Sequence, residues 1–153
     1  MERKSQEYQD REFVNDYATT VHNLAFVHQF LAEEFERNKK YQDAQIEFKK
    51  ALESYLKGWH YRNRLYDRRY VAQSEVRLAE CELGLARLFL EQGDKFNARF
   101  MAQSSFNRSV IIRELYLRIP QQEFRINDVE NIERESTRIC KVCGFEPHRS
   151  YLR

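Results

Sequence analysis

The chain has 153 residues, which is enough for one domain with a hydrophobic core of its own. Charged residues make up 33% of the sequence and nearly balance, and a net charge of +2 excludes a global attraction to nucleic acid or to membranes. No apolar run approaches the ~18 residues that span a bilayer, and the polar start MERKSQEYQDRE lacks the apolar core of a signal peptide.

Five helices are predicted from the apolar periodicity, and no segment alternates as a strand would. The chain has only four glycines and two prolines, which favours long helices. Apolar residues recur every three or four positions, and the predicted helices run over about 7–37, 41–61 or beyond, 69–91, 95–118 and 128–140. The first is either one helix or two nearly continuous ones, because the β-branched Thr19 and Thr20 weaken helix locally.

Short polar segments mark the predicted connections between these helices. Gly93 ends the third helix and Asp94 caps the fourth. The connection between the second and third helices is placed near Asn63. Pro120 cannot continue the fourth helix, which therefore ends just before it. Asn127 is expected to begin a capping box that starts the fifth helix.

Two stretches of the chain repeat one pattern of small and aromatic residues. The first holds Ala32, Phe35, Ala44, Phe48 and Ala51, and the second holds Ala86, Phe89, Ala98, Ala102 and Ser105. Each stretch reads as two amphipathic segments around a polar turn, and its small residues let two helix backbones approach. This spacing resembles the tetratricopeptide repeat (TPR) family. The copies lie 54 residues apart, against a usual TPR period of about 34.

The resemblance therefore implies an all-α fold of antiparallel, TPR-like helical hairpins with lengthened helices and with flanking helices at both ends. We assign residues 1–140 to a single TPR-like helical domain and residues 141–153 to a C-terminal tail. A hairpin cannot bury its apolar face alone, and repeat arrays need at least ~3 units. We therefore expect the end faces to be covered by the terminal helices, by a partner, or by self-association.

The TPR resemblance also implies a partner-binding face on the first helix of each hairpin. Carried over by spacing, this face would hold Phe26, Gln29, Glu33 and Glu36 in the first copy and Glu80, Leu83, Arg87 and Leu90 in the second. TPR proteins that clamp a C-terminal carboxylate use Lys and Asn at such places, and this chain departs from that pattern. The expectation is a non-enzymatic adaptor or scaffold subunit that binds another protein through a helical groove.

A basic region with interleaved aromatic residues offers an alternative function. Residues 57–70 contain Trp59, Arg62, Arg64, Arg68 and Arg69, together with tyrosines. Arginine and aromatic side chains could hold a single RNA strand by phosphate contact and base stacking. They could equally meet an acidic peptide, or the aromatic rings could pack between helices while the arginines extend over them. The alternative to the adaptor is therefore an RNA-associated factor.

The C-terminal segment contains the most site-like cluster of the sequence. Cys140 and Cys143 have the spacing of a zinc-binding pair, and His148 follows. A tetrahedral site needs a fourth ligand that the sequence does not supply nearby, so we expect two free thiols, no metal and no cofactor. Three cysteines without a secretory signal fit a reducing compartment, which favours a cytoplasmic, intracellular location, with the nucleus as an alternative.

Catalytic motifs are not apparent in the sequence. The four histidines are scattered along the chain, and no Gly-rich phosphate loop or nucleophile motif is present. Carboxylate pairs such as Glu33 and Glu34 are expected on an exposed helix face and need no acid–base role. We therefore predict that the protein is not an enzyme.

Overall fold

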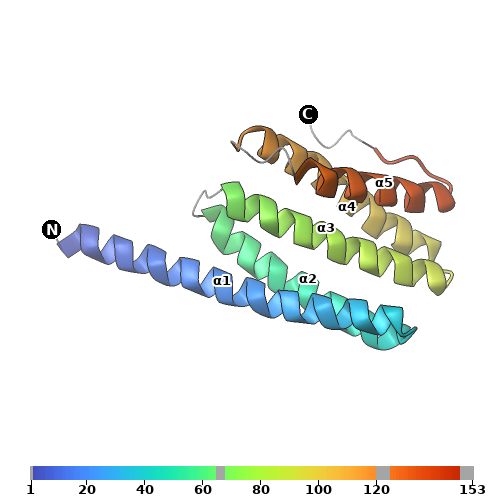
Figure 1. Cartoon of the computed structure of the whole chain (residues 1–153), viewed down its shortest axis with the longest axis horizontal. Coiled ribbons are helices and arrows are strands. Elements are labelled where there is room, and N and C mark those ends of the chain that lie inside the picture. Colours follow the sequence, from blue (N-terminus) through green and yellow to red (C-terminus); the bar gives the residue numbers. More distant parts are fainter. Residues whose placement is uncertain (1, 65–67, 120–124, 149–153) are drawn as a thin grey trace.

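The computed structural model of the chain describes residues 2–64, 68–119 and 125–148, with side chains from residue 10 onward except at position 64. Its helices are α1 (Glu2–Arg37), α2 (Tyr41–Arg64), α3 (Arg68–Glu91), α4 (Lys95–Leu117) and α5 (Ile126–Val142). Successive helices run antiparallel, and each packs mainly against its neighbours in sequence (Figure 1). The predicted all-α fold of antiparallel helical hairpins is confirmed.

Several predicted helix boundaries differ from the structure. α1 begins at Glu2 and continues through Thr19 and Thr20 without a break. Asn63 lies within α2, so the predicted turn position there was wrong, and residues 65–67 lie outside the described part. The predicted capping box was also wrong, because α5 begins at Ile126 and places Asn127 inside its first turn. Local propensity marks where a helix is able to start, but packing extends it in either direction.

The hairpin of α1 and α2 and the hairpin of α3 and α4 bury corresponding positions that lie 54 residues apart. The matched pairs are Ala18 and Ala72, Ala25 and Ala79, Ala32 and Ala86, Ala44 and Ala98, Phe48 and Ala102, Ala51 and Ser105, and Tyr55 and Ser109. Every member of these pairs is at most 1% exposed. Small residues dominate the list, and they let the paired helices approach closely along their length.

The turns of the two hairpins are also alike. Each turn closes with the same three backbone hydrogen bonds at positions 54 residues apart. The left-handed residue is Gly93 (φ 75°) in the second turn and Lys39 (φ 59°) in the first. Glycine adopts this conformation freely, whereas lysine has a steric cost there. As predicted, Asp94 caps α4, and its carboxylate accepts a hydrogen bond from the backbone N–H of Asn97 at 3.1 Å.

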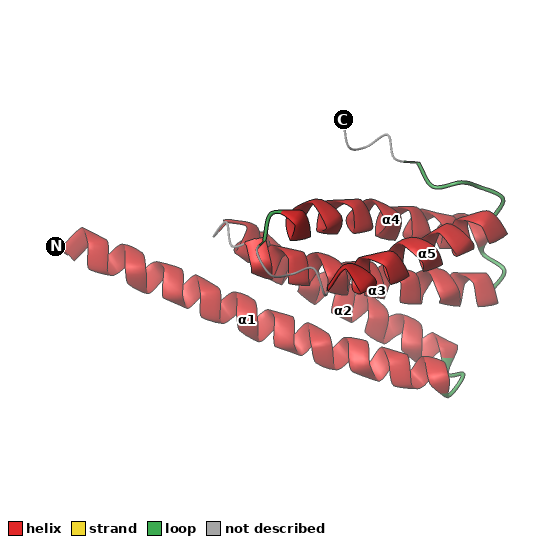
Figure 2. Cartoon of the chain, turned by 45° about the horizontal axis from the view of Figure 1, so that its top comes forward, coloured by secondary structure: helices red, strands yellow, loops and turns green. Residues whose placement is uncertain are grey.

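The central helix α3 contributes to two hydrophobic clusters. One of its faces packs Leu78, Cys81, Leu85 and Leu88 into the cluster of α1 and α2. Its other face packs residues such as Val76 and Ala79 into the cluster of α4 and α5. A helix that is buried on both faces holds its neighbours in a fixed arrangement. α3 therefore sets where α1 and α5 lie, one on each side of it (Figure 2).

Candidate functional site

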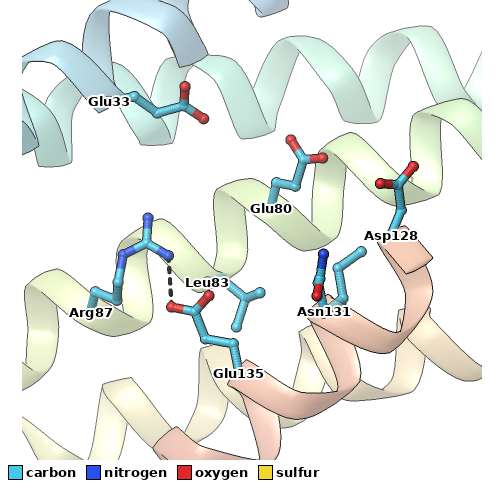
Figure 3. Close-up of a pocket in the computed structure, with 8 residues that line it drawn as sticks. Glu33, Glu80, Leu83, Arg87, Asp128, Asn131 and Glu135 are labelled. Atoms are coloured by element: carbon cyan, nitrogen blue, oxygen red, sulfur yellow. Dashed lines mark hydrogen bonds and ion pairs between the residues drawn. The ribbon is translucent and has the colours of Figure 1, made fainter.

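A pocket of about 220 Å³ lies where α1, α3 and α5 come together (Figure 3). It is lined by Glu33 from α1, by Glu80, Leu83 and Arg87 from α3, and by Asp128, Asn131, Ile132 and Glu135 from α5. We call this surface the α1/α3/α5 groove. Its volume is below the roughly 300–1,000 Å³ of typical small-molecule sites. It has room for a side chain of a bound protein segment.

Arg87 joins the three helices at one end of the groove. Its guanidinium donates to both carboxylate oxygens of Glu36 on α1, each at 2.9 Å, and to Glu135 on α5 at 2.9 Å. Burial alone would lower the pKa of Arg87, but the hydrogen bonds and charges of the two carboxylates outweigh it and raise that pKa. Arg87 therefore stays charged and fixes the spacing of α1, α3 and α5.

A buried amide positions two carboxylates on the α1 and α3 sides of the groove. The Gln29 side chain donates to Glu80 at 2.7 Å and to Glu33 at 3.1 Å, while its carbonyl oxygen accepts the Tyr55 hydroxyl at 2.7 Å. Arg77 also donates to Glu80, at 3.1 Å. Gln29 is only 2% exposed, so it holds the two carboxylates in place from the interior and is not accessible to a binding partner.

The edge of the groove on α1 is aromatic. Phe26 is 45% exposed and lies under the guanidinium of Arg77, whose central carbon is 5.1 Å from the ring centroid. Phe30, one turn further along α1, is 53% exposed. Leu90, the last residue of the predicted face, is half-buried and packs on the cluster of α4 and α5. The groove thus combines carboxylates with an apolar edge.

The structure brings together most of the face that the TPR resemblance implied. Glu33, Leu83 and Arg87 line the groove, and Glu36 binds Arg87 at its end. Sequence reasoning did not find the contribution of α5. Its signal was present, because Asp128, Asn131 and Glu135 have the i, i+3, i+7 spacing of one helix face.

The basic region of residues 57–70 is divided between interior and surface. Arg62 is 2% exposed, and its guanidinium contacts His22, Gln73 and Ser74 at 3.1–3.3 Å. The prediction of Arg62 as a surface contact residue was therefore wrong, because its guanidinium on α2 is buried in hydrogen-bonding contacts with side chains of α1 and α3. Trp59 is half-buried against the α1–α2 cluster.

Other members of that region do face solvent. Arg68 and Arg69 are exposed at the start of α3, beside Tyr70, which is 40% exposed. The side chain of Arg64 lies outside the described residues. The surface that remains for RNA is thus smaller than the sequence indicated.

The C-terminal cysteines and histidine are not arranged as a metal site. Cys140 is buried, Cys143 is half-buried, and burial raises the pKa of both thiols, which keeps them protonated at neutral pH. The backbone of His148 exchanges two hydrogen bonds, each of 3.0 Å, with the Gln103 side chain on α4. Within residues 2–64, 68–119 and 125–148, no group of three or more His, Cys, Asp or Glu side chains is placed to hold a metal ion.

The described helices also lack a candidate membrane span, since none of them combines the necessary length with sufficient apolar character. No protein-family model, no curated protein and no solved structure matches this chain.

Proposed function

We propose that this chain is a non-enzymatic protein-interaction module, built from TPR-like hairpins, that binds a segment of a partner protein in the α1/α3/α5 groove. The observation that carries the proposal is the convergence of three helices on one surface pocket whose charged side chains are held in place by hydrogen bonds to Arg87 and Gln29. Side chains that are already held in place at a surface pocket lose less conformational entropy when a segment binds there.

The chemistry of the groove favours a basic and partly apolar segment. Glu33, Glu80, Asp128 and Glu135 place carboxylates around the pocket. A lysine or arginine of the partner would enter it, while apolar side chains would rest on Phe26 and Phe30. Charged pairs of this kind set the orientation and the association rate of a complex more than its affinity. The apolar edge would supply much of the affinity.

The alternative function, RNA association through residues 57–70, relies on Arg68, Arg69 and Tyr70, which are exposed. Arg62 is not available for it. Phosphate binding would weaken steeply as salt concentration rises.

Selection from a displayed library of random peptides tests the proposal. The folded chain is immobilised beside two variants, Asp128→Lys in the groove and Glu130→Lys on the opposite side of α5. Both side chains are exposed, so neither change is expected to unfold the protein. We expect enriched peptides to carry lysine or arginine next to apolar residues, and to lose binding to Asp128→Lys but not to Glu130→Lys.

A parallel titration with fluorescent single-stranded RNA separates the two functions. RNA binding that is lost in Arg68→Glu/Arg69→Glu, together with no peptide enrichment, would replace the adaptor by the RNA-associated factor. Equal peptide binding by the Asp128 and Glu130 variants would show that the groove is not the binding site.

A further inference from the structure

The outer face of α1 carries a continuous apolar stripe. Phe13, Tyr17, Leu24, Val27 and Leu31 are 71%, 41%, 53%, 52% and 40% exposed. With Thr20 they occupy six successive positions at alternating spacings of four and three residues. This is the seam spacing of a coiled coil. We call these six residues the α1 outer stripe.

α1 carries a second stripe that the hairpin already uses. Ala18, Ala25 and Ala32 are fully buried, and these small residues let α2 lie close against α1. The outer-stripe residues lie on a different side of α1 from these alanines and stay exposed, with Tyr17 alone of them contacting an aromatic ring of α2. Scattered apolar residues are ordinary on a protein surface, but large apolar side chains at five of six successive seam positions indicate an interface.

The polar member of the stripe is suited to a buried seam. The Thr20 hydroxyl donates to the backbone carbonyl of Asp16 at 2.9 Å, so its donor is satisfied within the helix. Covering it leaves no unpaired hydroxyl donor, which would otherwise carry a free-energy cost. Tyr17, a member of the stripe, also contacts Tyr61 of α2, with ring centroids 5.0 Å apart, and this contact helps to fix the position of its ring.

α1 is also longer than the helix that covers it. Its 36 residues span about 54 Å, whereas the 24 residues of α2 span about 36 Å. The N-terminal part of α1 extends beyond the rest of the fold (Figure 1). Helices in water gain most of their stability from packing, so this extension is stabilised if another helix lies along it.

The residues beside the stripe favour a second copy of this chain over a highly charged partner. The flanking positions hold Val14, Val21, Asn23, Phe30, one acidic residue, Asp16, and His28, whose ring already contacts Glu47 of α2 at 2.6 Å. A strongly basic or acidic helix would find little charge to pair with there. Two copies of the same face would meet without strong repulsion.

We propose that two copies of this chain associate through their α1 outer stripes, with the two α1 helices antiparallel about a two-fold axis that passes between Thr20 and Leu24, at the level of residue 22 and next to Asn23. In this register Phe13 of one copy lies against Leu31 of the other, and Tyr17 lies against Val27. Each aromatic ring then faces a smaller aliphatic side chain, which suits interdigitated packing. The interface uses the outer side of α1 and leaves the pocket of the α1/α3/α5 groove open, while Phe30 lies between the seam and the edge of the groove.

Sedimentation equilibrium of the full chain tests the association. At about 50 µM, where even a dimer with micromolar Kd is populated, we expect a mass of twice 18.6 kDa. Leu24→Glu/Val27→Glu should shift the mass to a single 18.6 kDa and raise Kd by roughly a hundredfold or more. Its helical circular dichroism should fall only by the contribution of the N-terminal part of α1 that extends beyond α2, because both substituted residues are exposed in the single chain and the rest of the fold is unaffected.

The matched control is Phe96→Glu/Phe100→Glu on α4, where the two rings are 77% and 63% exposed. This variant should remain dimeric. A wild-type chain that sediments as a monomer, or control and stripe variants that dissociate alike, would overturn the proposal.

Cysteine cross-linking tests the orientation in a Cys143→Ser background, where the remaining cysteines are buried. In the antiparallel arrangement, Asn23→Cys lies next to the same residue of the other copy and should cross-link readily under mild oxidation. Phe13→Cys should not, since its counterpart lies at the far end of the seam. Faster cross-linking of Phe13→Cys than of Asn23→Cys would indicate parallel helices and would refute the antiparallel arrangement.

Discussion

Replacing Gly84 by alanine should destabilise the protein, although alanine is the better helix former. Gly84 lies in the middle of α3 and faces the ring of Phe48 on α2. A Cβ atom at this position would lie 2.6 Å from Cε1 and 2.8 Å from Cε2 of that ring. Both distances are shorter than 3.0 Å, which is about the shortest Cβ contact found in proteins. The ring is fully buried, and side chains in a densely packed core move only at a cost.

Two opposing contributions decide the magnitude. Alanine in place of glycine stabilises a helix interior by about 1 kcal/mol. Overpacking a core costs about 1–3 kcal/mol, and several ring atoms conflict here at once, which places the cost near 3. The expected net loss is therefore about 2 kcal/mol in the free energy of unfolding, or about 4–8 °C in Tm for a chain of this size.

The effect of Gly84→Ala should reverse sign when the ring is removed. Phe48→Leu lacks the Cε and Cζ atoms that conflict with the added methyl group. In this background Gly84→Ala should stabilise by up to about 1 kcal/mol, as the helix propensity alone dictates. Guanidinium unfolding of the four proteins of this cycle, followed by circular dichroism, measures the coupling between the two positions.

Gly58 provides a matched control within the same chain. A Cβ atom there would lie 3.4 Å from its nearest neighbour, the carbonyl oxygen of Ala18, which is ordinary van der Waals contact. Gly58→Ala should therefore stabilise in the wild-type background. The reasoning from the ring contact would be refuted if Gly84→Ala stabilised the wild-type protein. It would also be refuted if Gly84→Ala changed the free energy of unfolding by the same amount in the wild-type and Phe48→Leu backgrounds.

Two further changes test the buried polar groups. Burial, followed by the charges of Arg62 and Arg77, lowers the pKa of His22 from 6.5 to about 4. Because the unfolded chain then binds the proton more readily, stability should fall as pH drops from 6.5 towards 4, and urea unfolding should show a flatter profile for His22→Gln. Arg87→Met leaves two carboxylates without their shared partner and should cost about 1–3 kcal/mol, whereas Arg37→Met, on an exposed pair, should cost under about 0.5. Equal losses in the two arginine variants would contradict the bridging role of Arg87.

The helices and their turns were largely accessible from sequence, because they depend on neighbouring residues. Gly93 and Asp94 form a stop and start signal within two positions, and the structure confirms both roles. The start of α5 was missed because Asn127 has the capping chemistry but lies inside the helix. The start of α1 was missed because its first residues are polar and carry no apolar periodicity.

The groove was only partly accessible from sequence. Glu33, Leu83 and Arg87 were predicted from the spacing of one repeat pattern, and they do meet at one surface. Glu135 lies 48 positions from Arg87 in the sequence, and no local pattern indicates that the two side chains form an ion pair. Gln29 was expected on the partner-binding face from the TPR resemblance, and Arg62 was expected to contact a partner as part of the basic region 57–70. Their hydrogen-bonding partners include side chains of other helices, which hold both residues inside.

Sequence alone determined the class of the fold, its two similar hairpins and most helix limits, since periodicity, capping and glycine act within a few residues. Packing decided the rest. Packing brings the Phe48 ring against α3, so that position 84 has no room for a side chain. It also places Arg62 in the interior. On α1 it buries the alanine stripe and leaves most of the outer stripe exposed among the described helices. A side chain's exposure depends on which distant surfaces approach it, and that is a property of the assembled helices.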